Sequence, residues 1–188
     1  MIKNNRAVFL DRDGTLIASE VHDGIPIANN DPTEVVFLEG VLEACRELRA
    51  AGFLLILVTN QPDVARGLVP RKSVDLVNAA VVEYLGLTAA WTCFHDDKDN
   101  CNCRKPKPGL ILDSALSYQI HLDLTSALVG DRWRDVGAGK TAGISTVFVD
   151  QCYGETQLFK PDLTVTALID AVPWLIAQGD ENGSSKSI

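Results

Sequence analysis

The sequence contains no apolar run that approaches the length of a membrane-spanning helix, which takes about 20 residues. Its first residues, MIKNNR, also lack the apolar core of a secretory signal peptide. We therefore expect a cytoplasmic protein without a membrane partner. Three of the five cysteines cluster with His95, which in that reducing compartment is more typical of metal binding than of disulfide bonds.

An excess of positive charge is missing as well. The net charge is −8 and no basic stripe is present, which argues against a general nucleic-acid surface. A phosphorylated substrate is compatible with this charge, because Mg²⁺ and a few Arg or Lys side chains can reverse the potential in one pocket. We expect a small phosphorylated metabolite as the partner, and no nucleic acid.

Internal repeats and linkers are also absent, so we expect a single domain over residues 1–178. With 46% hydrophobic and 22% charged residues, the composition is that of a soluble globular protein. The last residues, 179–188, read GDENGSSKSI, a composition typical of a disordered tail. We expect the protein to be a monomer.

Short apolar runs alternate with segments of helical periodicity along most of the chain. Strands are predicted at residues 7–10, 53–58, 89–92, 127–129 and 145–149. Helices are predicted at residues 40–51, 70–85, 110–119, 138–142 and 163–177, and a loop at residues 17–30. This alternation predicts an α/β fold around a parallel sheet.

The first predicted strand, Ala7 to Leu10, ends abruptly in Asp11-Arg12-Asp13-Gly14-Thr15. Open α/β sheets bind ligands at the carboxyl edge, where these residues would lie. In an extended chain Asp11 and Asp13 share a face, and two such charges repel unless a cation or a proton lies between them. Mg²⁺ suits a site of this kind. The alternative is a polar turn with solvated carboxylates.

Two further predicted strands also end in polar residues. Thr59 and Asn60 follow the strand at 53–58, and their hydroxyl and amide groups can hydrogen-bond a phosphoryl oxygen without adding charge. Alone, this pair is most often a turn or a cap. Asp131 and Asp135 follow the strand at 127–129.

A metal site is predicted in the segment CFHDDKDNCNC, where Cys93, His95, Cys101 and Cys103 form a Cys-x-His-x5-Cys-x-Cys pattern. Three thiolates and one imidazole complete a tetrahedral Zn²⁺ site and leave no open position, so we expect a structural zinc. Free cysteines placed by chance would rarely fall at this spacing.

Basic residues that could bind phosphate occur at two places. The predicted metal segment runs directly into Arg104-Lys105-Pro106-Lys107-Pro108-Gly109, and the zinc loop would aim Arg104 and Lys105 rigidly. Arg66 lies in a predicted loop and could reach a second anionic group of the substrate. The alternative for all three residues is a solvated basic turn or loop.

These motifs, in this order, resemble those of the haloacid dehalogenase (HAD) phosphohydrolase superfamily. They are Asp11-x-Asp13, Thr59-Asn60, Lys105 and Gly130-Asp131-x-x-x-Asp135. The resemblance implies a doubly wound, Rossmann-like parallel sheet with a minimal cap, because the positions where many relatives carry a cap domain are short. The zinc-bound loop would be an additional feature.

The resemblance also implies a mechanism for a Mg²⁺-dependent phosphomonoesterase. Asp11 would be the nucleophile that forms an aspartyl-phosphate, and Asp13 would protonate the leaving alkoxide and then activate water. Mg²⁺ would be held by the Asp11 carboxylate, the Asp13 backbone carbonyl and Asp131, with Asp135 in support. The phosphoryl oxygens and the rest of the substrate would be bound by two groups of residues: Thr59, Asn60 and Lys105, and then Arg104 and Arg66.

Within the superfamily, the chain resembles the small zinc-containing subgroup of heptose 1,7-bisphosphate phosphatases and histidinol-phosphate phosphatase domains. Gln61 to Gly67 and Arg104 to Gly109 favour the heptose enzymes, and therefore a sugar bisphosphate. The five-residue gap between His95 and Cys101, and Arg132, favour the histidinol-phosphate enzymes. Two other classes are a non-catalytic zinc-bearing binding module and a nucleic-acid 3′-phosphatase, and the charge of −8 weighs against the latter.

Overall fold

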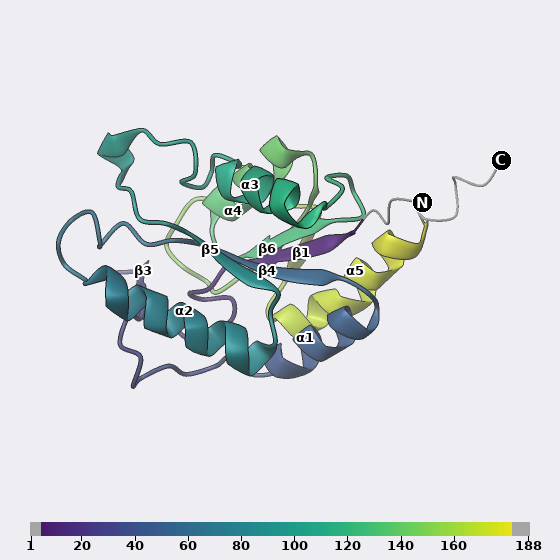
Figure 1. The fold of residues 1–188 in the computed structure, drawn as a ribbon. Coiled ribbons are helices and arrows are strands. Elements are labelled where there is room, and N and C mark those ends of the chain that lie inside the picture. The colour runs from purple at the N-terminus through teal and green to yellow at the C-terminus, as the bar shows by residue number, and fades with distance from the viewer. Residues whose placement is uncertain (1–4, 182–188) are drawn as a thin grey trace.

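A computed structural model describes residues 5–181, in which a six-stranded parallel sheet runs through the centre (Figure 1). Its strands lie in the order β5 (Ala89–Cys93), β4 (Leu54–Asn60), β1 (Ala7–Leu10), β6 (Ala127–Gly130), β7 (Ser145–Val149) and β8 (Leu163–Val165). The chain moves outward from β1 to β5, returns to the other side of β1, and moves outward again to β8. This order confirms the predicted doubly wound α/β fold.

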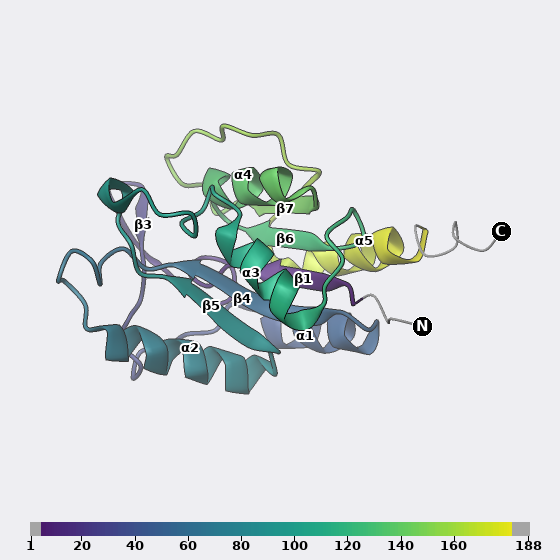
Figure 2. The ribbon, with the colours of Figure 1, turned by 45° about the horizontal axis from the view of Figure 1, so that its top comes forward.

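Helices cover both faces of the sheet and complete three layers (Figure 1, Figure 2). One layer holds α1 (Val41–Ala50), α2 (Arg71–Leu85) and α5 (Leu168–Glu181), and the other holds α3 (Gly109–Tyr118) and α4 (Trp133–Ala142). Among residues 5–181, none of the helices combines the length and the apolar character that crossing a bilayer requires.

The strand β1 is buried on both faces. Val8 and Leu10 belong to the hydrophobic core beneath α1, α2 and α5, whereas Ala7 and Phe9 belong to the core beneath α3 and α4. A strand covered by helices on both sides needs apolar residues at consecutive positions, which explains the unbroken run Ala7–Leu10.

The position of β1 determines where the predicted motifs meet. Leu10 pairs in register with Leu57 of β4 and with Val129 of β6. The residues that follow these three positions therefore lie side by side at the carboxyl edge of the sheet, where the strand order reverses.

The segment 17–30, predicted as a loop, instead contains an antiparallel hairpin of β2 (Glu20–His22) and β3 (Ile25–Ile27). Its turn is formed by Asp23 and Gly24, whose φ angles are 53° and 77°. Asp-Gly is favoured in two-residue hairpin turns because both positions need positive φ. The loop prediction was therefore wrong here, and the hairpin agrees with the expected minimal cap.

The predicted helix at 163–177 was also wrong in its first residues, because Leu163–Val165 form the edge strand β8 and α5 begins at Leu168. The carboxylate of Asp162 fixes this strand, since its Oδ2 accepts hydrogen bonds at 2.8 Å from both the backbone N–H and the hydroxyl of Thr146 on β7. At its other end α5 continues to Glu181, and the rest of the predicted tail lies outside the described residues.

Candidate active site and metal centre

Three carboxylates meet at the carboxyl edge of the sheet. Asp11 follows β1, Asp131 follows β6, and Asp135 lies in the first turn of α4. One oxygen from each carboxylate lies within 4.8 Å of the others, and all three residues are buried. This set of hard oxygen donors can hold Mg²⁺.

Two glycines allow the carboxylates to lie this close to the backbone. A Cβ atom on Gly14, where φ is +74°, would lie 2.1 Å from Oδ2 of Asp131. A Cβ atom on Gly130 would lie 2.3 Å from Cγ of Asp135. Any larger residue at either position would displace the carboxylate, so both glycines are needed for space, and Gly14 also for its backbone conformation.

A buried cation, Lys105, lies against two of the carboxylates. Its Nζ is 2.8 Å from Oδ1 of Asp11 and 2.5 Å from Oδ1 of Asp135, and it donates a hydrogen bond to the Val58 carbonyl at 2.8 Å. Burial alone would lower the pKa of Lys105, but the negative charges of Asp11 and Asp135 outweigh burial and raise it. The amine therefore remains charged.

One ammonium group does not balance three carboxylates. Burial, followed by the negative charge of Asp11, raises the pKa of Asp131 and raises that of Asp135 to about 6. The Tyr153 hydroxyl lies beside Asp131, and the pKa of Tyr153 is raised by burial and then by the negative charge of Asp131. Yet neither Asp131 oxygen meets hydrogen-bond geometry with any group in residues 5–181. A divalent cation would supply the missing positive charge, so the site fits Mg²⁺.

Asp13 is held beside this cluster by Arg12 and Gln61. The Arg12 guanidinium donates to both carboxylate oxygens of Asp13 at 3.1 Å, and the Gln61 amide donates to Oδ2 at 2.8 Å. Burial raises the pKa of Asp13, and the positive charge of Arg12 opposes this increase. The carboxyl group is thus fixed in orientation and is more readily protonated than a solvated one.

Arg12 was not predicted to belong to the site, and its side chain is fully buried. Besides Asp13, its guanidinium donates to Oδ1 of Asn78 on α2 at 2.8 Å, to the Asn29 carbonyl at 3.1 Å and to Oδ1 of Asn30 at 2.7 Å. A buried arginine is stable only when its donors are paired, as they are here. Its position between two acids gave no sign of burial, because such a residue is usually solvated.

The two polar residues that end β4 have different surroundings. Thr59 is buried, and its hydroxyl accepts a hydrogen bond from the Gln61 amide at 2.9 Å. The Asn60 amide pairs with the backbone of Lys105, donating to its carbonyl at 3.0 Å and accepting from its N–H at 3.1 Å. The amide of Asn60 therefore hydrogen-bonds the backbone of Lys105 and helps to position that residue.

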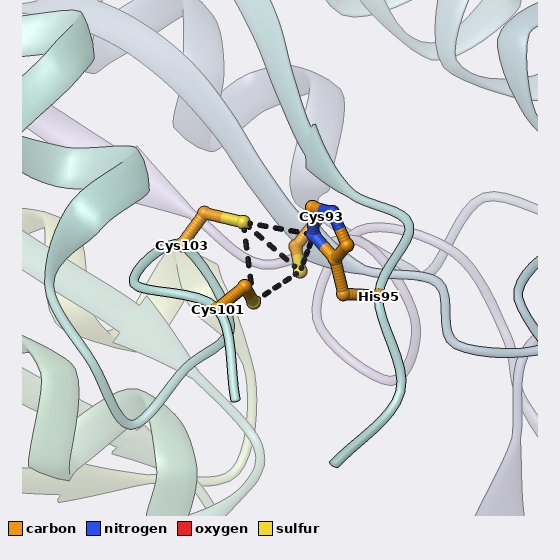
Figure 3. A group of neighbouring side chains, drawn as sticks. All are labelled: Cys93, His95, Cys101 and Cys103. Carbon is orange, nitrogen blue, oxygen red and sulfur yellow. Dashed lines mark hydrogen bonds between the residues drawn. The ribbon is translucent and has the colours of Figure 1, made fainter. Parts of the chain in front are cut away.

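The four predicted zinc ligands converge at the end of β5 (Figure 3). The Sγ atoms of Cys93, Cys101 and Cys103 lie 3.3–3.7 Å apart, and Nδ1 of His95 lies 3.3 Å from Cys103 Sγ and 3.6 Å from Cys93 Sγ. All three cysteines are free thiols. Three sulfurs and one nitrogen around a single point fit tetrahedral Zn²⁺.

A cavity of about 520 Å³ opens above the carboxylates. Asp11, Asp13 and Lys105 lie at its base. Its walls come from the hairpin, the loop after β4, the start of α4 and the metal loop, which is the segment 94–108 between β5 and α3. They include four arginines: Arg66, Arg104, Arg132 and Arg134.

Two of these arginines were predicted to contact substrate. Arg66 is already paired with two carboxylates, Asp63 at 3.1 Å and Asp96 at 2.7 Å, and its pKa is raised first by the hydrogen bond to Asp96. Arg104 contacts Asp97, with 2.8 Å between its Nε and Oδ1. The structure thus places both at the cavity, with Arg66 the more fully paired.

The other two arginines, Arg132 and Arg134, follow Asp131 in the sequence and were not predicted to line the cavity. Arg132 forms an ion pair with Glu155, with 2.8 Å between Nε and Oε2. Arg134 lies over the Trp133 ring, with its Nη1 3.6 Å from Oδ1 of Asp97. Burial lowers the pKa of Arg134, and the negative charge of Asp97 opposes part of this decrease. Nothing in the string GDRWRD distinguishes these residues from solvated helix-start residues.

Comparisons with known proteins point to one family. A family model described as HAD-hydrolase-like matches residues 102–171. The chain is similar to the D-glycero-beta-D-manno-heptose-1,7-bisphosphate 7-phosphatase of Helicobacter pylori, with 33% identity over 150 residues that cover 77% of this chain and 82% of the relative. The corresponding enzyme of Escherichia coli is 34% identical over 165 residues, which cover 78% of this chain and 79% of the relative.

The fold matches a solved structure of the same kind. A crystal structure of D,D-heptose 1,7-bisphosphate phosphatase from B. bronchiseptica, complexed with magnesium and phosphate, aligns with a TM-score of 0.74 and 29% sequence identity. The alignment covers 92% of this chain and 99% of that chain. The sequence motifs, the order of the strands and these relatives all indicate the same HAD-like family.

Proposed function

Because the chain belongs to the family of D-glycero-beta-D-manno-heptose-1,7-bisphosphate 7-phosphatases, a group of HAD-like phosphoric monoester hydrolases, we propose that it removes one phosphate from this heptose bisphosphate. The observation that carries the proposal is the cavity itself. Its base holds Asp11, Asp13 and Lys105, and its wall holds arginines suited to a second anionic group.

Asp11 is the proposed nucleophile. One of its carboxylate oxygens attacks phosphorus, the bond from phosphorus to the sugar oxygen breaks, and an aspartyl-phosphate forms on Asp11. Lys105, held at 2.8 Å from Asp11, stabilises the charge that develops on the phosphoryl oxygens. The Thr59 hydroxyl and the backbone around Asp11 supply further donors.

Asp13 is the proposed acid and base. Burial keeps its proton available for the leaving alkoxide, and Arg12 and Gln61 orient the carboxyl group. Once ionised, Asp13 takes a proton from water as the water oxygen attacks the aspartyl-phosphate. The bond from phosphorus to Asp11 then breaks and releases inorganic phosphate.

The residues that would hold Mg²⁺ are Asp11, Asp131, Asp135 and, through its backbone carbonyl, Asp13. When bound, this ion offsets the repulsion between the carboxylate nucleophile and the phosphate dianion. The four residues that would hold a structural Zn²⁺ are Cys93, His95, Cys101 and Cys103. The metal loop leads directly into Arg104 and Lys105, so its order fixes both side chains.

The experiment is phosphate release in the presence of Mg²⁺ from heptose 1,7-bisphosphate and from histidinol phosphate, measured side by side. We expect a strong preference for the bisphosphate and the release of one phosphate per molecule. Preference for histidinol phosphate would instead assign that substrate. Release from neither would leave the phosphatase class and reject both substrates.

The first predicted variant is Asp11→Asn. Turnover should fall by about a thousandfold or more, because the amide cannot form the aspartyl-phosphate. The variant should fold and keep its zinc, since Asp11 lies apart from the four zinc ligands. Circular dichroism and zinc content are the controls. Substantial residual activity would show that another group is the nucleophile.

A further inference from the structure

The arginines on the cavity wall are not equally neutralised. Arg66 has two carboxylate partners, Asp63 and Asp96, and Arg132 has two contacts with Glu155. These two arginines are paired within the protein. They have little charge left for a ligand.

Arg104 and Arg134, in contrast, share a single carboxylate. Nε of Arg104 lies 2.8 Å from Oδ1 of Asp97, and Nη1 of Arg134 lies 3.6 Å from the same oxygen. The contact between Nη2 of Arg104 and Oδ2 of Asp97 is 3.4 Å. In direct ion pairs, two positive charges thus share one negative charge, on a protein whose net charge is −8.

One donor of this pair is unused. Nη1 of Arg104 is buried and has no hydrogen-bond partner in the part of the chain that the structure describes. A buried guanidinium nitrogen without a partner is costly, and it is satisfied when an anion binds beside it. Arg104 and Arg134 both line the same cavity as Asp11 and Lys105.

We propose that Arg134 joins Arg104, which is already expected to hold the rest of the substrate, in a second anion subsite of this cavity, and that Asp97 is an internal counter-ion displaced when the second phosphate of a sugar bisphosphate binds. This inference rests on the proposed function and assigns Arg134, rather than Arg66, as the partner of Arg104. Asp97 is suited to leave, because its side chain is 59% exposed and can turn into solvent.

A phosphate group would fill this position better than Asp97 does. Its oxygens can accept from both guanidinium groups at once, including the unused Nη1 of Arg104. A monophosphate bound at the carboxylate cluster has no second anionic group, so Asp97 would stay paired with the two arginines. The subsite therefore selects for substrates with two anionic groups.

The test compares kcat/KM for heptose 1,7-bisphosphate with kcat/KM for p-nitrophenyl phosphate, which has one phosphate. Arg134→Gln should lower this ratio about tenfold or more, through a higher KM for the bisphosphate, because a charged hydrogen bond is lost. Arg134→Lys should retain part of the preference. The matched control is Arg46→Gln, an exposed residue of α1, which should leave the ratio unchanged.

Asp97→Asn separates a counter-ion from a structural support. Removal of a competing anion should lower the KM for the bisphosphate several-fold. An Asp97 that merely held the arginines in place would give the opposite result, a KM that rises as in Arg134→Gln, and this would overturn the displacement. Thermal unfolding of each variant reports whether it is folded.

Failure of the subsite differs from failure of the proposed function. If the unmodified enzyme prefers the bisphosphate and Arg134→Gln keeps the full preference, the subsite is wrong and the function stands. If the unmodified enzyme hydrolyses p-nitrophenyl phosphate without preferring the bisphosphate, both are wrong.

Discussion

The buried Nζ of Lys105 contacts three oxygen atoms, one from a carbonyl group and two from carboxylates. Carboxylates left without this cation would repel one another in a largely buried site. The same amine therefore contributes to folding as well as to the proposed chemistry.

Lys105→Met should lower the free energy of unfolding by about 3 kcal/mol, the usual cost of breaking a buried ion pair from one side. Added Mg²⁺ should return part of this loss, because the cation binds to the carboxylates that Lys105 no longer neutralises. Urea unfolding with and without Mg²⁺ measures both effects. Lys72→Met, an exposed substitution on α2, is the control, and an equal loss in both variants would contradict the prediction.

Local residue patterns predicted some site residues and missed others for identifiable reasons. Asp11 and Lys105 were found because they occur in recognisable motifs, and Asp131 because it follows a strand. Arg12 and Arg134 were missed, because the partners that bury or orient them come from distant segments: Asn78 on α2 for Arg12 and Asp97 in the metal loop for Arg134. The catalytic and binding roles of all these residues stay predictions.

At the scale of elements, the metal loop has no hydrophobic core of its own and is expected to depend on zinc. Cys103→Ser should reduce bound zinc from about one per chain to nearly none and lower the melting temperature by several degrees. Cys152→Ser is a matched control, since Cys152 is exposed and lies outside the four-ligand cluster. Metal analysis and thermal unfolding measure the two effects, and a zinc content that survives Cys103→Ser would show that the ligand set is misassigned.

The edge strand β8 is held by the Asp162 carboxylate, which also lies 2.5 Å from Nζ of Lys140. Burial would raise the pKa of Asp162, but the hydrogen bonds from Lys140 and Thr146 outweigh burial and lower it. A lowered pKa means that the folded state favours the ionised form. The stabilisation is therefore complete well above the ordinary carboxyl pKa and is lost as the pH falls through the folded value.

Asp162→Asn should accordingly destabilise the protein by about 1 kcal/mol at pH 7, a modest value because the side chain is partly exposed and solvent screens its charge. The difference between variant and unmodified protein should shrink below about pH 4, where the carboxyl group of the unfolded chain takes up a proton, and vanish once the folded carboxylate is protonated as well. Urea unfolding across pH 3–7 tests this, with the exposed Asp113→Asn as control. A constant difference at all pH values would contradict an ionic role for Asp162.

At the scale of the whole molecule, the alternation of apolar runs predicted the sheet and its helices well. The run Ala7–Leu10 became β1 without change, because a strand buried on both faces has a distinctive composition. The hairpin and β8 were missed, because strands of three residues carry too little periodicity to be distinguished from loops or helix starts. Monomeric state and the domain limits 1–178 stay predictions.

The base and the wall of the cavity are stabilised in different ways. The carboxylates at the base follow strands that belong to the hydrophobic core, so a change there disturbs folding. The wall around Asp97 and Arg104 belongs to a segment that adds little to that core. Its length and charge can therefore vary between descendants of one ancestor while the reacting groups stay unchanged, and new substrates can be acquired in evolution without a new fold.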